Sequence, residues 1–497
     1  MAQLRDAPTV RPTAEELANP VRFVRSLTAL GSEYGIVRVE LPEGYLPPTS
    51  NPLKRLGERG GPERFPTKLQ LVHGLRSGKP FQPSGRHSLS SYAAQAAAFA
   101  QRWDAEHPGT CRGPEAVERA FWAAARGDYG RVTVQYGSDL DTGDYGSGFD
   151  APEACASHPW SLPALCTAPG NLLACLGDEL IAGVTRPWLY CGMRFAAFGY
   201  HVEDHGLLSV NYLHPFSQAP KTWYGAPASA KAGVEAALRN NAKKCERGAK
   251  DLLGRMNTVL PPEAVLAEGV PLVRALQRPG DLVITFPDAF HAGFSHGVTF
   301  GEAVNLATPE WLEVGRRAVV AYAAVERPPV FAHAEVVVQY ARALRRAAQA
   351  GVDGSAARLT GGDTRCEWTS RALGLLAGDV EAERRLLKEA AVPVRKRSAP
   401  KKRDMRCGVC GEALYASVLV CDRHRTRMSC PRHAHADYCG CGAKTRRLEQ
   451  FVSVEELRAL EASVLPEGMS VTAAPHVVEA PPASPPSPAP SQGQPPA

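Results

Sequence analysis

The chain has 497 residues, 13 of them cysteine, and a formal net charge of +6 at pH 7. A hydrophobic share of 44% excludes a wholly disordered chain, and the length favours roughly two to four structural units. No apolar run reaches about eighteen residues and the first residues are not an apolar signal segment, so we expect no membrane span and no secretory leader. Six cysteines lie between Cys407 and Cys441, which favours metal binding over a secreted disulfide scaffold.

The first 150 residues predict three units. Residues 6–50 combine a helix start, with Thr13 as a plausible N-cap, and a strand at 35–39. Residues 51–115 are rich in Gly, Pro and Arg and then in Ala, which predicts a linker with a helix. Alternation around Val132 indicates a strand that leads into a larger domain at 116–321.

Two motifs in that domain carry candidate metal ligands. In the first motif, His201 and Glu203 are two residues apart, and on a β-strand such residues point to the same side. The second motif supplies His291 from a later apolar segment. Two histidines and one carboxylate form the facial triad that holds Fe(II) on three sites and leaves three open.

Further polar residues follow His201 at positions that suggest the same cavity. Ser209 and Asn211 share its parity if the strand continues without a bulge. Lys221 stands in an otherwise apolar and aromatic segment, where burial of its charge is costly unless it meets an anion. A dicarboxylate would supply that anion.

The last part of the chain predicts helices, a metal-binding module and a tail. Residues 322–395 look helical, and 336–350 have an amphipathic spacing. Two basic runs, 395–397 and 401–403, fit a nuclear import signal, a nucleic-acid contact or a solvated linker. A metal-binding unit at 396–450 and a short helix at 451–472 precede a Pro/Ala/Ser tail at 473–497, which we expect to be disordered.

Eight possible ligands in 407–441 come as four closely spaced pairs. Eight ligands fill two closed tetrahedral zinc sites, which favours a structural role, but the spacing does not reveal which pairs share an ion. His435 is a spare candidate. The eight are Cys407, Cys410, Cys421, His424, Cys430, His433, Cys439 and Cys441.

An ordered set of stretches resembles the JmjC family of Fe(II)/2-oxoglutarate oxygenases, and the JARID-type histone lysine demethylases most of all. The matching stretches are 188–193 (WLYCGM), 198–205 (FGYHVEDH), 209–214 (SVNYLH), 221–225 (KTWYG), 284–294 (ITFPDAFHAGF) and 302–308 (EAVNLAT). The resemblance implies a mixed α+β fold: a double-stranded β-helix (jelly roll) with a JmjN segment, flanking helices and a small C5HC2-like zinc finger. The ARID and PHD modules of JARID-type proteins have no counterpart between the JmjN-like and JmjC-like parts.

The resemblance also implies roles for individual residues. His201, Glu203 and His291 would bind Fe(II). The family usually has Cys where His424 stands, and commonly Asn where Ser295 stands. Tyr190 and Asn305 would line the substrate pocket. The 2-oxoglutarate site would be formed by Tyr136, Phe198, Ser209, Asn211, Lys221 and Trp223.

The function that this resemblance implies is removal of N-methyl groups from a histone lysine by hydroxylation, with O₂ as co-substrate and formaldehyde as product. Methylated lysine-four of histone H3 is the expected site, and the expected location is nuclear. Expected partners are the histone H3 tail or nucleosome and chromatin-complex subunits, with a DNA contact through the basic linker. A JmjC protein hydroxylase and a non-catalytic chromatin scaffold are the alternatives; a scaffold commonly loses a metal ligand, whereas this chain keeps all three.

Overall fold

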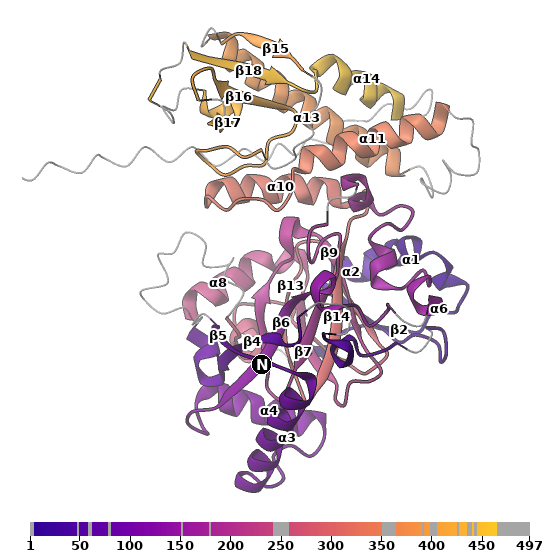
Figure 1. The fold of residues 1–497 in the computed structure, drawn as a ribbon, viewed down its shortest axis with the longest axis vertical. Helices are drawn as coiled ribbons and strands as arrows, with labels where there is room; N and C mark the ends of the chain where they lie inside the picture. Colours follow the sequence, from indigo (N-terminus) through magenta and orange to yellow (C-terminus); the bar gives the residue numbers. More distant parts are fainter. Residues whose placement is uncertain are drawn as a thin grey trace, which may run out of the picture.

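The computed structural model has a β-barrel, a layer of helices above it and a small sheet at the far end (Figure 1). The barrel is built from two packed sheets, so the expected jelly-roll core within a mixed α and β fold is confirmed. The residues that the structure describes are 4–46, 49–57, 62–77, 81–150, 153–177, 180–241, 258–349, 364–389, 392–397, 405–424, 427–434, 440–441 and 445–464.

The smaller barrel sheet carries both candidate histidines. Its central strands are buried on both faces, which is why they read as apolar runs rather than as alternating patterns. In spatial order the strands are β1 (Arg5–Asp6), β11 (Val273–Gln277), β10 (Lys221–Ala226), β13 (Phe290–Ser295) and β8 (Ala197–His201).

The larger sheet closes the opposite side of the barrel. Apart from the parallel pair of β2 and β3, the named strands of this sheet pair antiparallel. The order is β2 (Thr9–Val10), β3 (Ile36–Val39), β12 (Leu282–Thr285), β9 (Leu208–Leu213), β14 (Thr299–Leu306), β7 (Trp188–Gly192), β6 (Thr133–Asp141), β4 (Phe65–Leu71) and β5 (Gln82–His87).

The N-terminal segment is part of both sheets. Strand β1 pairs in parallel with β11, and β3 pairs antiparallel with β12. Between β2 and β3 run two short helices, α1 (Pro20–Ser26) and α2 (Thr28–Tyr34), and Asn19 caps α1 by accepting a hydrogen bond from the Arg22 amide. The segment thus completes the barrel rather than forming a separate unit.

Residues 51–115 contribute more than the expected linker and helix. The helix is present as α3 (Leu89–Glu106), but β4 and β5 also add two strands to the edge of the larger sheet. Helix α4 (Pro114–Arg126) then covers the smaller sheet, with the Phe121 ring stacked on Phe294 of β13 at a centroid distance of 4.0 Å. Strand β5 contains no apolar alternation, so the sequence pattern did not reveal it.

Four longer helices connect the barrel to the small sheet at the top of Figure 1. They are α10 (Trp311–Ala324), α11 (His333–Gln349), α13 (Thr364–Glu389) and α14 (Val454–Val464). Trp311 fixes α10 to the barrel, because its indole N–H donates to the His205 carbonyl at 2.9 Å. No helix among the described residues has the length and apolar character that crossing a bilayer requires.

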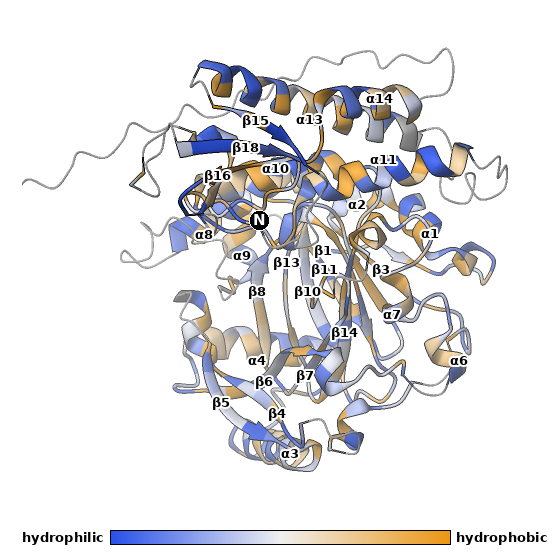
Figure 2. Ribbon diagram, turned by 45° about the horizontal axis from the view of Figure 1, so that its top comes forward, coloured by the Kyte–Doolittle hydropathy of each residue, from blue (hydrophilic) through white to orange (hydrophobic). Residues whose placement is uncertain are grey.

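The small sheet is antiparallel except at its edge, in the order β15 (Val394–Lys396), β18 (Arg446–Gln450), β16 (Ser417–Cys421) and β17 (Met428–Ser429). Strands β15 and β18 are strongly hydrophilic, in contrast to the barrel strands (Figure 2). The remaining α-helices of the described residues are α5 (Thr142–Tyr145), α6 (Glu153–Ala156), α7 (Leu162–Leu165), α8 (Lys231–Asn241) and α9 (Pro262–Leu266). The C-terminal tail expected at 473–497 lies outside the described residues.

Candidate metal and co-substrate site

The three candidate iron ligands meet inside the barrel. His201 at the end of β8 pairs with His291 of β13, and their rings lie 4.2 Å apart between centroids. Glu203 follows β8 in an extended conformation, and its Oε1 lies 3.3 Å from His291 Nε2. One nitrogen or oxygen from each residue falls within 4.8 Å of the others, as a shared ion requires.

Backbone contacts orient both imidazoles. His201 Nδ1 lies 2.8 Å from the Gly199 carbonyl oxygen, and His291 Nδ1 lies 3.1 Å from that of Ala289. A ring whose Nδ1 donates to a carbonyl presents Nε2 with its lone pair to a metal. Both histidines therefore have the tautomer and direction that an ion between them needs.

The charge state of the cluster also suits a divalent metal. Burial lowers the pKa of His201 to about 4, so its imidazole is neutral near pH 7. Burial alone would raise the pKa of Glu203, but the hydrogen bond and charge of His291 outweigh it and lower the pKa to about 2. Two imidazoles and one carboxylate are the donor set of a facial-triad Fe(II) site.

A cavity of about 280 Å³ opens beside this cluster. The sequence predicted Ser209 and Asn211 on the same strand as His201; they lie instead on β9, because β8 ends at His201 and a short 3₁₀ turn, Asp204–Gly206, intervenes. Both nevertheless line the cavity. Its other predicted lining residues are Tyr136, Tyr190, Phe198, Lys221 and Trp223.

Lys221 is the most unusual side chain in this cavity. It is 2% exposed, and its Nζ lies 5.6 Å from the Phe198 ring centroid, 5.8 Å from that of Tyr190 and 5.9 Å from that of Trp223. Lys221 makes no ion pair with any described residue, and burial lowers its pKa to about 8. The aromatic rings stabilise the buried ammonium only in part, so an anion bound in the cavity would lower the cost of its burial.

Comparison with known families agrees with this geometry. Residues 188–306 match the family described as "JmjC domain, hydroxylase", residues 8–40 match the jmjN domain and residues 407–460 match the C5HC2 zinc finger. The chain is a JmjC-domain protein. Fe(II) and 2-oxoglutarate are the metal and co-substrate that a JmjC domain implies, and the residues of the cavity fit both.

Curated relatives of this JmjC protein include two rice proteins and one from Arabidopsis thaliana. The rice (Oryza sativa subsp. japonica) lysine-specific demethylase JMJ705 is 35% identical over 381 residues, 68% of this chain and 28% of the relative. Lysine-specific demethylase JMJ703, also from rice, is 29% identical over 514 aligned positions, which cover 92% of this chain and 41% of the relative. Arabidopsis lysine-specific demethylase JMJ17 is 34% identical over 355 residues, which cover 69% of this chain and 28% of the relative. The chain therefore spans less than half the length of each of these relatives.

Asn305 does not line the cavity of this JmjC protein, although we expected it beside Tyr190. Its side-chain amide donates to Glu203 Oε2 at 3.0 Å and to the Leu208 carbonyl at 3.2 Å. Asn305 thus orients Glu203, a candidate metal ligand, through a hydrogen bond outside the cavity. Its position in the sequence could not reveal this contact.

The cavity mouth contains residues that sequence reasoning missed. Lys68 of β4 forms an ion pair with Asp139 of β6, and both are about half exposed. Asp139 has a φ of +59°, a left-handed conformation that is uncommon for non-glycine residues. Phe81 and Ser138 complete this rim. The rim was missed because it depends on the pairing of β4 with β6.

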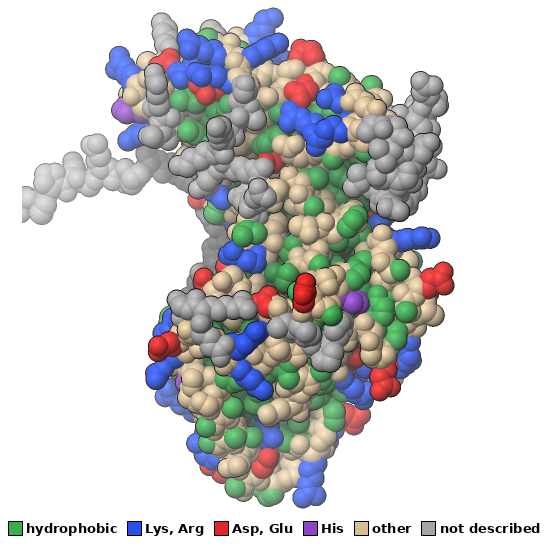
Figure 3. All heavy atoms as spheres, turned by 45° about the vertical axis from the view of Figure 1, so that its right-hand side comes forward, with side chains coloured by type: hydrophobic (Ala, Val, Ile, Leu, Met, Phe, Trp, Pro, Cys, Tyr) green, Lys and Arg blue, Asp and Glu red, His purple; other side chains and the backbone are tan. Residues whose placement is uncertain are grey.

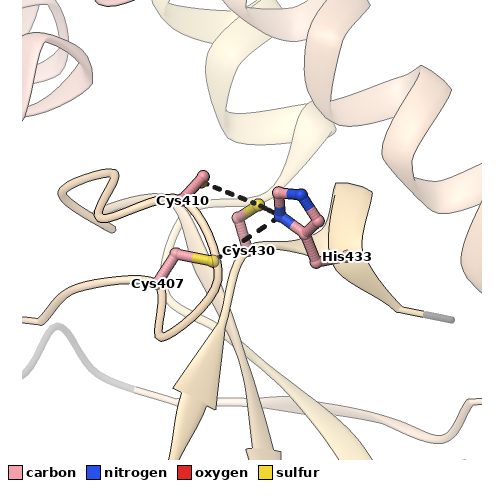
Figure 4. Close-up of side chains that lie close together, drawn as sticks. All are labelled: Cys407, Cys410, Cys430 and His433. Carbon is pink, nitrogen blue, oxygen red and sulfur yellow. Dashed lines mark hydrogen bonds between the residues drawn. The ribbon is translucent and has the colours of Figure 1, made fainter. Parts of the chain in front are cut away.

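The zinc-finger region of this JmjC protein contains two clusters of Cys and His. Cys407, Cys410, Cys430 and His433 converge from two loops (Figure 4), with Cys430 Sγ 3.0 Å from His433 Nδ1. Four such ligands are the number that a closed tetrahedral zinc site needs.

The second cluster joins Cys421, His424 and Cys441, with Cys441 Sγ 3.3 Å from His424 Nδ1. Cys407 and Cys410 therefore lie with Cys430 and His433, whereas Cys421 and His424 lie with Cys441, an interleaving that the spacing had left open. Cys439 and the spare His435 lie outside the described residues.

Proposed function

We propose that this chain is a histone lysine demethylase that depends on Fe(II) and 2-oxoglutarate. The observation that carries the proposal is the Lys221 ammonium, which forms no ion pair with a described residue and lies in the same cavity as the His201, Glu203 and His291 cluster. It gives the cavity a metal site and a carboxylate site together, the pair of sites that this co-substrate needs. The relatives are named lysine-specific demethylases, which favours a methylated lysine as substrate.

In this proposal, His201, Glu203 and His291 hold the iron. With 2-oxoglutarate and O₂, the bound iron supplies the oxidising power that hydroxylates an N-methyl group, and the carbon leaves as formaldehyde. Lys221 binds the distal carboxylate of 2-oxoglutarate, with the Tyr136 hydroxyl as a second donor. The side chains of Ser209 and Asn211, which also line the cavity, add polar contacts to it.

The aromatic residues keep water out of the reaction. Trp223 packs against Phe198 with ring centroids 4.7 Å apart, and the Trp223 indole N–H donates to Gln277 at 2.8 Å, which fixes its orientation. Tyr190 stacks on Tyr136 at 6.2 Å and faces the cavity, so we assign it as a wall of the methylammonium pocket. An aromatic face attracts a desolvated methylammonium cation.

We further propose methylated lysine-four of histone H3 as the substrate and the nucleus as the location. Two features support this choice: the sequence around Tyr190, which resembles JARID-type demethylases, and the match to the C5HC2 zinc finger. Two structural zinc ions would occupy the two Cys/His clusters. The basic run 395–397 begins on the exposed edge strand β15, where it could contact DNA; 401–403 lie outside the described residues.

A JmjC protein hydroxylase is the second candidate, because the matching family is itself described as a hydroxylase. Both candidates use the same metal and co-substrate. They differ in the product, since a hydroxylase adds one oxygen and a demethylase removes methyl-sized units.

The deciding experiment incubates the protein with Fe(II), ascorbate, 2-oxoglutarate and a panel of trimethylated histone H3 peptides, and reads peptide masses. We expect loss of methyl units from the lysine-four peptide, with succinate formed in equal amounts. A gain of one oxygen would favour the hydroxylase. His201→Ala serves as the matched inactive control, and retained activity in it would contradict the iron assignment.

Succinate without a change in peptide mass would mean that the iron centre works and the substrate is wrong. Neither succinate nor a mass change, in iron-loaded protein, would favour the non-catalytic scaffold.

A further inference from the structure

A second cavity, of about 500 Å³, is rich in arginine. It lies at the N-terminal end of α4 and is lined by Arg38, Arg112, Arg119, Arg274 and Arg278. The only carboxylates among its described lining residues are those of Asp6, Glu115 and Glu118. On the face drawn in Figure 3, basic and acidic side chains are intermingled over the barrel, so a concentration of guanidinium groups is not a general property of this surface.

Two of the five arginines are neutralised by ion pairs. Arg38 Nε lies 2.8 Å from Asp281 Oδ2, and its Nη2 lies 2.7 Å from Glu40 Oε1. Arg274 contacts Glu118 at 2.8 Å and Asp6 at 3.2 Å. These ion pairs connect β3, β11 and α4. Because Arg38 and Arg274 are already paired with carboxylates, they contribute little positive charge to ligand binding.

The other three arginines are exposed, and none of them forms an ion pair with a described residue. Arg112 lies just before α4, Arg119 lies about one turn into it, and Arg278 follows β11, so two segments far apart in the sequence bring guanidinium groups to one concave surface. Among the described lining residues, Glu115 is the one carboxylate that is likewise exposed and forms no ion pair with a described residue, so the three arginines without such a pair outnumber it.

We propose that Arg112, Arg119 and Arg278 bind the phosphate backbone of duplex DNA. Guanidinium groups bind phosphate oxygens in a bidentate manner and are weakly hydrated, so they are suited to this contact. The three exposed arginines line one concave surface, so a single duplex laid on it offers phosphate groups to all of them. The contact depends on charge and position rather than on base identity, and it is therefore independent of DNA sequence.

The position of this surface relative to the iron cavity supports the assignment. Lys221 and Thr222 are neighbours on β10, and Lys221 lines the iron cavity whereas Thr222 lines the arginine cavity. Consecutive strand residues point to opposite faces of a sheet, so the two cavities lie on opposite sides of the smaller sheet. DNA on one side leaves the other open for a peptide. The proposed histone substrate is the reason to expect DNA nearby, but DNA binding itself does not depend on turnover.

The test measures fluorescence anisotropy of a labelled 30-base-pair duplex with the full chain at several salt concentrations. The variant is Arg112→Ala/Arg119→Ala/Arg278→Ala. Its matched control is Arg22→Ala/Arg102→Ala/Arg346→Ala, which removes three exposed arginines elsewhere and changes the net charge equally. Because about 0.9 counterions are released per phosphate contact, we expect the slope of log K against log salt to fall by about 2.7 in the variant. We expect at least a tenfold loss of affinity in the variant and less than a twofold loss in the control.

Equal losses of DNA affinity in the alanine variant and its matched alanine control would overturn the proposal, since net charge alone would then explain binding. Displacement of the duplex by millimolar inorganic phosphate, beyond that caused by chloride at equal ionic strength, would show a small-anion site and would also overturn it. Arg112→Lys/Arg119→Lys/Arg278→Lys should keep most of the salt slope, which separates lost charge from lost folding. Succinate-coupled turnover of a free histone peptide should be unchanged in the alanine variant. If the protein binds DNA but does not turn over any peptide, the demethylase proposal is contradicted and the DNA-binding proposal is not.

Discussion

Asn305 donates its side-chain amide to Glu203 Oε2 at 3.0 Å, while the other oxygen of Glu203 lies 3.3 Å from His291 Nε2. Glu203 follows the end of β8 and has no ladder hydrogen bonds to fix its direction. The amide of Asn305 therefore supplies the orientation that the strand does not.

Replacement of Asn305 by Ala should weaken iron binding about 10- to 100-fold, the usual effect of losing a group that orients a metal ligand. Titration of the metal-free protein with Fe(II) under anaerobic conditions measures this directly. Asn240→Ala, an exposed position on α8, is the control. An unchanged dissociation constant for iron would show that Glu203 is oriented without Asn305.

Lys221→Met should raise the KM for 2-oxoglutarate roughly tenfold to a hundredfold, because a hydrogen bond to a charged group contributes about 1.5–3 kcal/mol. The value of kcat should change much less, since the metal ligands remain. Lys68→Met at the cavity mouth removes the same charge and serves as the control. Similar KM values for the two variants would remove Lys221 from the proposed carboxylate site.

The pH dependence of 2-oxoglutarate binding should report Lys221 as well. Burial lowers the pKa of this ammonium to about 8, so above that pH the free protein loses the charge that the carboxylate needs. Binding of the dianion favours the protonated form, so a proton is taken up on binding near and above pH 8. Calorimetry in buffers of different ionisation enthalpy should detect this uptake in the wild type and find it missing in Lys221→Met.

His214 and Glu302 form a fully buried pair whose loss should destabilise the barrel. His214 Nε2 lies 3.0 Å from Glu302 Oε1, both side chains are 0% exposed, and the Ser147 hydroxyl donates to Oε2 at 2.8 Å. His214→Ala leaves a buried carboxylate with one partner fewer, at a cost of about 3–5 kcal/mol. Urea denaturation measures the free energy of unfolding, with the partly exposed His158→Ala as control. A loss no larger than in that control would contradict the assigned role.

The two zinc clusters should release their ions at different rates. In the first cluster all three cysteines are buried, whereas in the second His424 is exposed and Cys441 is partly exposed. A chromogenic chelator should therefore remove about half of the zinc quickly and the rest slowly. Cys441→Ser should remove only the fast phase, and Cys407→Ser the slow one. Release of all the zinc in one phase in the wild type would contradict this difference.

The sequence predicted His201 and Glu203 as a pair because their relation is local, whereas His291 was found through its own apolar motif far along the chain. His201 and Glu203 are two residues apart, and extended backbone places them on one side even though β8 ends between them. Lys221 was recognisable because a charge within an apolar segment needs a partner. These features depend on near neighbours in the chain, and so they could be deduced without knowing the fold.

The relations that the sequence did not predict depend on long-range pairing. Cys407 and His433 share one cluster only because the loops that carry them meet in the folded module, a fact that no ligand spacing encodes. Likewise, β5 has no alternating pattern, since its place at the sheet edge rests on backbone hydrogen bonds to β4. Ser209 and Asn211 do line the cavity, but from β9 and not from the continuous strand that the parity argument assumed, and nothing in the sequence predicted that Asn305 of β14 turns to Glu203.

The pairing of the N-terminal strands with late barrel strands determines when this protein can fold during its synthesis. Val39 of β3 pairs with Leu282 of β12, so β3 has no partner on that side until about 240 further residues have been made. At roughly 5–20 residues per second, a ribosome needs on the order of 10–50 s for that stretch. During this interval the apolar edge of β3 remains open to other chains, and a chaperone that covers it would raise the yield of folded protein.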